Sequence, residues 1–274
     1  MAETREVVIA PGGDARQEWR DLWRYRELFF FLAWRDLLVR YKQTAIGASW
    51  SLLRPLLMMA LFTVIFGVLA RLPSEGVPYP LFVYSALLPW QLFAGTMADC
   101  GNSLQTNSNL LGKIWFPRLL VPASAMVGGL VDFLVSFVFL AALMAWYGIA
   151  PGPRVAALPL FLGLALLSAA GLGLWFAALN IRYRDYRFVL PFVVQYGLYA
   201  SPVGYSIAII PERWRMLYSI NPMAGVAEGF RWALFGGPFR VDRAGFCISV
   251  GLSLLILVTG LRHFRRTERT MADF

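Results

Sequence analysis

The sequence is poor in charge and in the side chains that most enzymes use for catalysis. Charged residues make up only 15% of its 274 residues, against roughly 25% in soluble domains. Its single histidine, His263, argues against histidine-based triads and against zinc motifs that need several histidines. The two cysteines, Cys100 and Cys247, lie on different apolar segments, where we expect them to be small buried residues. We therefore expect neither a catalytic site nor a metal site in this chain.

The chain also lacks a nucleotide-binding loop. The run Leu111-Gly112-Lys113-Ile114 invites comparison with a P-loop, which needs a glycine five residues before its second glycine and a Ser or Thr after the lysine. Asn107 and Ile114 occupy those two positions. We therefore expect no ATP site and no cofactor in this chain.

Apolar residues, by contrast, are abundant. They make up 58% of the chain, and the mean hydropathy is +0.59. They gather in runs that approach or exceed the ~20 residues needed to cross ~30 Å of hydrocarbon. We predict an all-α integral membrane protein with six transmembrane helices, at about Ser51–Ala70, Leu81–Gly101, Leu119–Tyr147, Val155–Leu179, Phe188–Ile210 and Ala244–Leu261.

Basic residues outnumber acidic ones by 25 to 16, and most of them fall on one side of this topology. With both chain ends in the cytoplasm, two short outer loops carry one arginine each, Arg71 and Arg154, as the positive-inside rule favours. Positive charge here serves orientation and contact with anionic headgroups rather than nucleic acid. The chain then divides into a flexible tail (1–15), a cytoplasmic interface-helix region (16–50), a six-span domain (51–262) and a cytoplasmic tail (263–274).

An amphipathic helical pattern starts at Arg16 and precedes the first span. Basic residues, among them Arg20 and Arg24, share one face, while aromatic and aliphatic residues such as Trp19 and Trp23 cover the other. This spacing is typical of a helix that lies on the membrane surface.

The stretch 211–243 is too apolar for a solvated outer loop. Asn221 as N-cap and Pro222 at the first helical position begin a short helix, and Gly236 with Gly237 can end it. At about 14 residues this helix is too short to cross the bilayer, so we predict a re-entrant or interfacial hairpin. Glu228 and Arg231 lie three apart and can pair within it, although an ordinary pair on the helix surface gives the same spacing.

Two further features fall within the predicted spans. Asp132 is an intramembrane carboxylate, which is either functional or a structural hydrogen-bonding group. Aromatic residues of the second and fifth spans can stack on sugar rings, or can simply face lipid or pack in the core. These path candidates are Phe82, Tyr84, Phe93, Tyr196, Tyr199 and Tyr205.

Several motifs in the same order resemble one family, the polysaccharide-exporting ABC-2 permeases, and most closely their O-antigen type. They are Arg35-Asp36 with Arg40-Tyr41-Lys42-Gln43, Gly47, Trp50 and Pro55; Gly112 to Arg118; Asn180 to Asp185; Ser201-Pro202-Val203; and Asn221-Pro222-Met223 with Glu228 to Arg231. Together they cover residues from about 30 to 262.

The resemblance implies a transport subunit without enzymatic activity in the bacterial inner membrane. Two copies would pair, and two separate ATPase subunits on the cytoplasmic face would bind ATP and Mg²⁺. A coupling segment at 107–118 would dock into the ATPase through Leu111, Gly112, Lys113, Ile114, Trp115, Phe116 and Arg118. The cargo would be a polysaccharide on a polyprenyl diphosphate lipid, such as O-antigen. Candidate diphosphate contacts at its entrance are Arg40, Lys42 and Arg54, and the hairpin 211–243 with Asn221, Pro222, Glu228 and Arg231 would form an outer gate.

Two alternatives remain open at this point. The chain can be an ABC-2 permease for another cargo, such as a drug or a teichoic or capsular polymer. It can also be a membrane enzyme or scaffold that uses its spans only as an anchor.

Overall fold

The computed structural model describes residues 15–42, 49–113, 116–183 and 185–270, and in these ranges the regular structure is helical throughout. The predicted tail at 1–14, the last residues 271–274 and the motif positions Gly47, Ile114, Trp115 and Arg184 lie outside these ranges. The helices are α1 (Ala15–Arg24), α2 (Arg26–Lys42), α3 (Ser49–Phe62), the π-helical η1 (Thr63–Leu69), α4 (Tyr79–Thr106), α5 (Ser108–Leu111), α6 (Leu120–Trp146), the 3-10 turn η2 (Pro153–Ala157), α7 (Leu158–Arg182), α8 (Tyr186–Ala200), the 3-10 turn η3 (Ile207–Ile209), α9 (Glu212–Tyr218), α10 (Pro222–Phe235) and α11 (Arg243–Thr270).

Within the described ranges, five helical segments are long and apolar enough to cross a membrane. They are Trp50–Leu69, Tyr79–Thr106, Leu120–Trp146, Pro153–Arg182 and Arg243–Glu268, which correspond to the first four predicted spans and the last. The predicted fifth span at Phe188–Ile210 differs. Its helix, α8, has 15 residues and ends at Ala200, and the chain then turns before η3 begins at Ile207.

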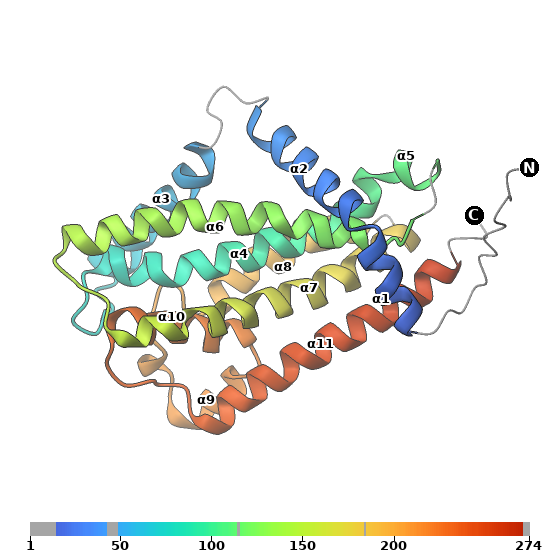
Figure 1. The fold of residues 1–274 in the computed structure, drawn as a ribbon. Helices are drawn as coiled ribbons and strands as arrows, with labels where there is room; N and C mark the ends of the chain where they lie inside the picture. The colour runs from blue at the N-terminus through green and yellow to red at the C-terminus, as the bar shows by residue number, and fades with distance from the viewer. Residues whose placement is uncertain (1–14, 43–48, 114–115, 184, 271–274) are drawn as a thin grey trace, which may run out of the picture.

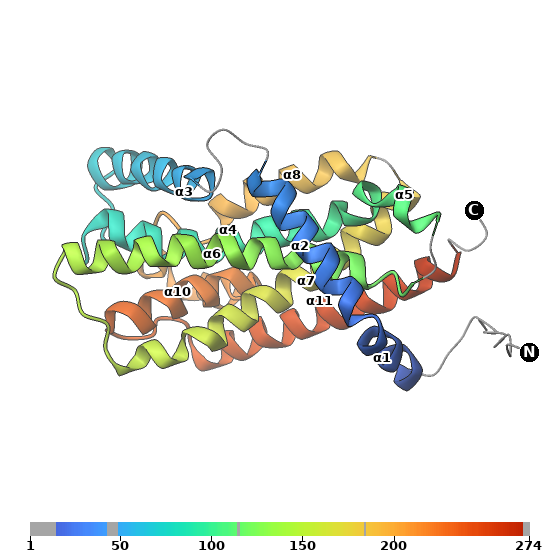
Figure 2. The same cartoon turned by 45° about the horizontal axis from the view of Figure 1, so that its top comes forward.

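The long helices form an elongated bundle with α4 at its centre (Figure 1). Helix α4 packs against α6 and α7, and α11 packs on the far side of α7. Helix α10 lies against α4 and α7 at one end of the bundle, whereas α1, α5 and the end of α11 lie at the other. Figure 2 shows α2 crossing α6 near that second end, which we call the inner end.

Glycine lets the central helices approach closely. A Cβ on Gly260 of α11 would lie 2.3 Å from the carbonyl oxygen of Gly171 on α7, and a Cβ on Gly173 would lie 2.7 Å from the Cys100 side chain on α4. Small residues of this kind permit tight contacts between transmembrane helices, where packing replaces the hydrophobic drive of water. Cys100 is buried as expected, but the same prediction for Cys247 is wrong, because its side chain is exposed on α11.

The predicted amphipathic helix is present as two helices that meet at Tyr25. Leu32 and Ala33 on one face of α2 are buried in the protein. The opposite surface of α1 and α2 exposes large aromatic side chains, namely Trp23, Phe30, Phe31 and Trp34. One face therefore docks α2 onto the bundle, and the other is suited to the apolar edge of a bilayer.

Candidate functional site

A cluster of charged side chains joins α2 to the bundle, and we call it the inner charge network. A carboxylate oxygen of Asp132, Oδ2, lies 2.7 Å from Arg40 NH1, and the other Arg40 nitrogen, NH2, lies 2.5 Å from Oδ2 of Asp99. The hydroxyl groups of Tyr41 and Ser51 each donate to Oδ1 of Asp132 over 2.6 Å. Asp132 therefore connects four helices, because its partners come from α2, α3 and, through Arg40, α4.

Local structure positions this network. Arg40 lies in the last turn of α2, and Gly128 lies one turn before Asp132 on α6. A Cβ on Gly128 would lie 2.8 Å from Arg40 NH1, so the glycine leaves room for the guanidinium. Burial lowers the pKa of Arg40, but Asp99 and Asp132 outweigh that effect and the net direction is upward. Arg40 therefore stays charged between two carboxylates.

Asp99 is the member of this network that the sequence analysis missed. It lies on α4 near the end of the predicted second span, and its partner Arg40 is 59 positions away in the chain. The interpretation of Asp132 as a group that bonds to a neighbouring helix is confirmed by its contacts with Arg40, Tyr41 and Ser51.

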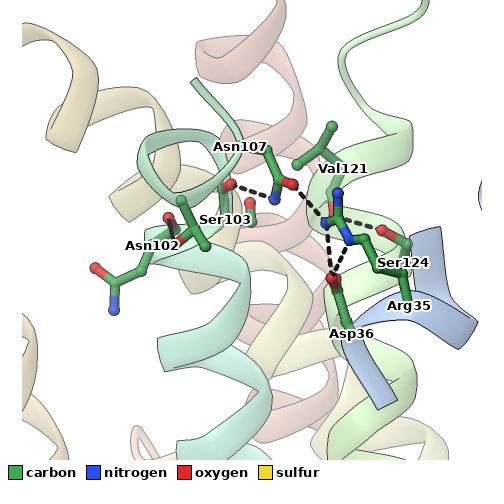
Figure 3. Close-up of polar contacts among 8 residues, drawn as sticks. Arg35, Asp36, Asn102, Ser103, Asn107, Val121 and Ser124 are labelled. Atoms are coloured by element: carbon green, nitrogen blue, oxygen red, sulfur yellow. Dashed lines mark hydrogen bonds and ion pairs between the residues drawn. The ribbon is translucent and has the colours of Figure 1, made fainter. Parts of the chain in front are cut away.

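A second contact ties α2 to the segment between α4 and α6. Arg35 NH2 donates to Oδ1 of Asn107 over 2.5 Å and to Oδ1 of Asp36 over 2.7 Å (Figure 3). Asn107 is the residue at which α4 ends and α5 begins, and its amide nitrogen donates to the Ser103 carbonyl over 2.9 Å. This hydrogen bond links the start of α5 to the middle of α2.

The described part of the segment 107–118 has an exposed tip between anchored sides. Gly112 and Lys113 are exposed, whereas Phe116 is buried in a cluster with Phe264 at the inner end. The backbone N–H of Arg118 donates to Oε1 of Glu268 on α11 over 3.2 Å. Leu111 and Arg118 are half-buried, and Ile114 and Trp115 lie outside the described residues.

At the opposite end, which we call the outer end, a buried arginine fixes an irregular stretch of chain. Arg231 is only 6% exposed, and it donates to the carbonyl oxygens of Val203 over 2.8 Å, Tyr205 over 3.2 Å and Phe82 over 3.3 Å. Its guanidinium carbon lies 3.6 Å from the centre of the Phe82 ring. The non-helical residues after α8 thus have an internal partner, which is the condition for irregular backbone at membrane depth.

Glu228 and Arg231, which the sequence analysis suggested can pair, act electrostatically on each other but are not in direct contact. No ion pair joins them among the described residues, and both are buried rather than on a helix surface. Glu228 instead accepts from the backbone N–H of Arg240 over 3.4 Å. Arg240 Nε lies 2.9 Å from Oε1 of Glu75, which also accepts a hydrogen bond from Ser206.

The predicted ends of α10 are confirmed. The side chain of Asn221 accepts from the Met223 backbone N–H over 3.0 Å, and Pro222 is the first helical residue. The helix ends at Phe235 because Gly236 and Gly237 adopt φ values of 77° and 81°, a region that glycine enters without steric cost.

The six aromatic path candidates divide by exposure. Phe82, Tyr84 and Phe93 are buried in the core of the chain, and Tyr205 is half-buried with its hydroxyl 2.6 Å from that of Tyr218. Tyr196 and Tyr199 are exposed at 64% and 53%. They share one face of α8 with two exposed phenylalanines, Phe188 and Phe192.

The three entrance candidates also divide. Arg40 is committed to Asp99 and Asp132, whereas Lys42 and Arg54 are exposed and have no ion pair with any described residue. The structure therefore brings Arg40 into the protein and leaves the other two cations accessible.

Comparison with known proteins adds a family to this geometry. Residues 27–235 match the family described as ABC-2 type transporter. The chain is 27% identical over 257 residues to an O-antigen export system permease protein of Myxococcus xanthus, covering 93% of this chain and 97% of that protein. It is 25% identical over 248 residues to an O-antigen export system permease protein of Klebsiella pneumoniae, covering 90% and 94%. It is 22% identical over 240 residues to a polysialic acid transport protein of Escherichia coli, covering 86% and 92%.

The match spans more than three quarters of the chain and includes the inner charge network, the segment 107–118 and the whole of α10. The chain belongs to the ABC-2 type transporter family.

Proposed function

We propose that this chain is the transmembrane subunit of an ABC exporter for a polyprenyl-diphosphate-linked polysaccharide such as O-antigen in the bacterial inner membrane. The observation that carries this proposal is similarity over almost the full length of O-antigen export permeases. The cargo is lipid-linked, so its polymer and its diphosphate have to cross the bilayer together. A separate ATPase that binds ATP and Mg²⁺ drives the transport, and this chain is not itself an enzyme.

The proposed topology has six crossings with both chain ends in the cytoplasm. Both described ends of the chain lie at the inner end, where α1 and the end of α11 contact the same cluster around Phe116. A chain whose two ends share one side crosses the membrane an even number of times. The five long segments therefore need one more crossing, which we assign to α8 with the irregular stretch held by Arg231. Helix α10 is then part of a re-entrant hairpin, which enters and leaves the bilayer on the outer side.

The proposed coupling route starts at the segment 107–118, whose exposed tip docks into the ATPase. Motion of this tip reaches α2 through the bond between Asn107 and Arg35. It then reaches the spans through Arg40 and Asp132. Side-chain pairs that can exchange partners suit such a route, because each has two discrete arrangements available.

The proposed substrate path uses the accessible members of the candidate sets. Lys42 and Arg54 meet the diphosphate at the entrance, since Arg40 is held by two carboxylates. Tyr196 and Tyr199 on the exposed face of α8 meet the sugar chain, against a second copy of this subunit. The hairpin at 211–243 closes the outer end of the path.

Deletion of the gene in its host tests the proposal. We expect lipid-linked polymer to accumulate inside the cell and the surface polysaccharide to disappear, with both restored by the intact gene. Unchanged surface polysaccharide in the deletion strain would overturn the proposal.

A capsular polymer is the second candidate cargo, because the chain is also similar to a polysialic acid transport protein. Chemical analysis of the polymer that accumulates separates the two. A polymer whose sugars match the surface lipopolysaccharide supports O-antigen, whereas one that matches the capsule supports the second candidate.

The coupling segment has its own test. Lys113→Glu reverses the charge of the exposed tip, and we expect it to abolish export while the protein still reaches the membrane in normal amount. Arg187→Glu is the matched control, because Arg187 is an equally exposed cation on α8 outside this segment. Equal export by the two variants would contradict a docking role for the tip.

A further inference from the structure

The inner end of α7 and α11 carries a histidine and two arginines that none of the roles above uses. His263 of α11 stacks on Trp175 of α7, with ring centres 4.3 Å apart and an angle of 17° between the planes. The Trp175 indole N–H donates to the Thr259 hydroxyl over 3.2 Å. The two helices run in the same direction and are held in contact by Gly171 and Gly260, so this stack has a fixed position.

Two arginines complete the group. Arg182 ends α7, Arg266 lies one turn beyond His263, and both exert a direct electrostatic effect on the His263 imidazole. Both arginines are exposed. Arg182 lies over the Tyr183 ring at 5.5 Å, a contact that leaves its N–H donors available.

Arg182 and Arg266 differ from Arg35 and Arg40 in having no carboxylate partner among the described residues. Neither Arg182 nor Arg266 makes an ion pair with any described residue, whereas Arg35 and Arg40 each pair with aspartate. Asp185 is exposed and takes part in no ion pair in the described ranges, and Glu268 accepts from the Arg118 backbone.

The position of the group in the fold decides which anion it meets. The apolar run of α7 ends at Ile181 and that of α11 ends at Leu261, just before the basic stretch 262–266, so the group lies where a spanning helix passes into the headgroup layer. Clusters of basic residues between transmembrane helices at this level bind lipid headgroups, and arginine presents paired N–H donors that fit phosphate oxygens.

We propose that Arg182, His263 and Arg266 form a binding site for the phosphate of an anionic phospholipid. The lipid tails lie along the exposed surfaces of α7 and α11, and the Trp175–His263 stack holds the middle of the site. The site requires only a bilayer around these two helices, so it does not depend on the cargo or on the ATPase.

The test uses the purified full-length protein in a neutral detergent. Thermal unfolding is followed while phosphatidylglycerol is titrated into the micelles, with phosphatidylcholine and inorganic phosphate as separate arms. We expect phosphatidylglycerol to raise the unfolding temperature in a saturable way, because a ligand that binds only the folded state stabilises it. We expect neither phosphatidylcholine nor inorganic phosphate at equal concentration to do so.

The double substitution Arg182→Gln with Arg266→Gln should weaken the apparent affinity for phosphatidylglycerol by about twenty-five-fold, because each arginine near a bilayer surface contributes roughly a factor of five toward anionic lipid. The variant with lysine at both positions should retain most of the affinity. Unfolding of the double variant in phosphatidylcholine shows whether its fold is intact.

The matched control replaces Arg26 and Arg187 with Gln, which removes the same charge from two other exposed positions. If this control loses as much affinity for phosphatidylglycerol as the Arg182 and Arg266 variant, the effect comes from general surface charge, and the proposed site is overturned. If inorganic phosphate raises the unfolding temperature as much as phosphatidylglycerol does, the group binds a soluble anion, and the proposal of a lipid ligand is overturned. An unchanged titration in the Arg182 and Arg266 variant would also overturn the proposal.

Discussion

The inner charge network and the buried Arg231 are both arginine sites, yet they bond in opposite ways. Arg40 is 33% exposed and pairs with the side chains of Asp99 and Asp132 on two different helices. Arg231 is 6% exposed and bonds to three backbone carbonyls. The first site joins elements that are each complete helices. The second replaces the hydrogen bonds that a broken helix lacks.

This difference separates a contact that can rearrange from one that cannot. Side-chain pairs at the edge of the bundle can separate while water meets both partners, so their net contribution is modest. The carbonyls of Val203 and Tyr205 lie in buried irregular backbone, where loss of the arginine leaves them without a side-chain donor among the described residues. We therefore expect the outer site to set stability and the inner network to set coupling.

The largest effect should come from Arg231→Met. This change removes an arginine that donates to three backbone carbonyls and whose positive charge acts on the buried Glu228, so we expect a loss of about 3–5 kcal/mol in unfolding free energy. Thermal unfolding of the purified protein measures it. Arg213→Met, at an exposed arginine of α9, is the control and should be close to neutral. Similar stability in the two variants would remove the contrast between the two sites.

A smaller effect should follow from breaking the inner network. Asp132→Asn keeps a hydrogen-bond acceptor for Tyr41 and Ser51 but removes one of the two charges that face Arg40. Because the pair is about a third exposed, we expect a loss of only about 1 kcal/mol in stability.

The same change should strongly reduce export if the network transmits motion. A double-mutant cycle with Arg40→Met measures the coupling directly, in both stability and ATPase-linked export. Additive effects on export in this cycle would show that Arg40 and Asp132 act independently. The inner charge network and the Arg231 site would then differ only in their contributions to stability.

The smallest change in stability should come from Asn107→Ala. It removes the hydrogen bond from Arg35, which keeps Asp36 as a partner, so we expect a loss of at most about 1 kcal/mol. We expect ATPase activity of the assembled complex to continue while export falls. Asn102→Ala is the control, because Asn102 lies near the same end of α4 but makes no hydrogen bond to α2 among the described residues. Export that falls equally in both variants would argue against the Asn107 contact as the link.

Features set by neighbouring residues could be predicted from the sequence. The start of α10 at Asn221 and Pro222 and its end at Gly236 depend on local hydrogen bonding and on backbone freedom, which residue type encodes directly. The long apolar runs likewise predicted the five long helical segments.

Features set by distant contacts could not be predicted in this way. The end of α8 at Ala200 is stabilised by Arg231, which lies about thirty positions later in the chain, although Pro202 and Gly204 do signal a break within the apolar run. Asp99 carried the same signal as Asp132, a carboxylate within a predicted span, but its pairing with Arg40 could not be predicted because Arg40 lies on a helix that crosses the bundle. The division of the aromatic candidates into buried and exposed sets also required the packing of α4 and α8.

The contact between Gly171 and Gly260 has a mechanical consequence. Because a Cβ on Gly260 would lie 2.3 Å from the carbonyl oxygen of Gly171, the backbones of α7 and α11 touch at this point, and we expect the two helices to move as one unit. We therefore expect a displacement at one end of this helix pair to reach its other end. Helix α3, by contrast, exposes large side chains such as Leu57 and Leu61 at 59% and 49%, so we expect it to move more readily against the bundle than α11 does against α7.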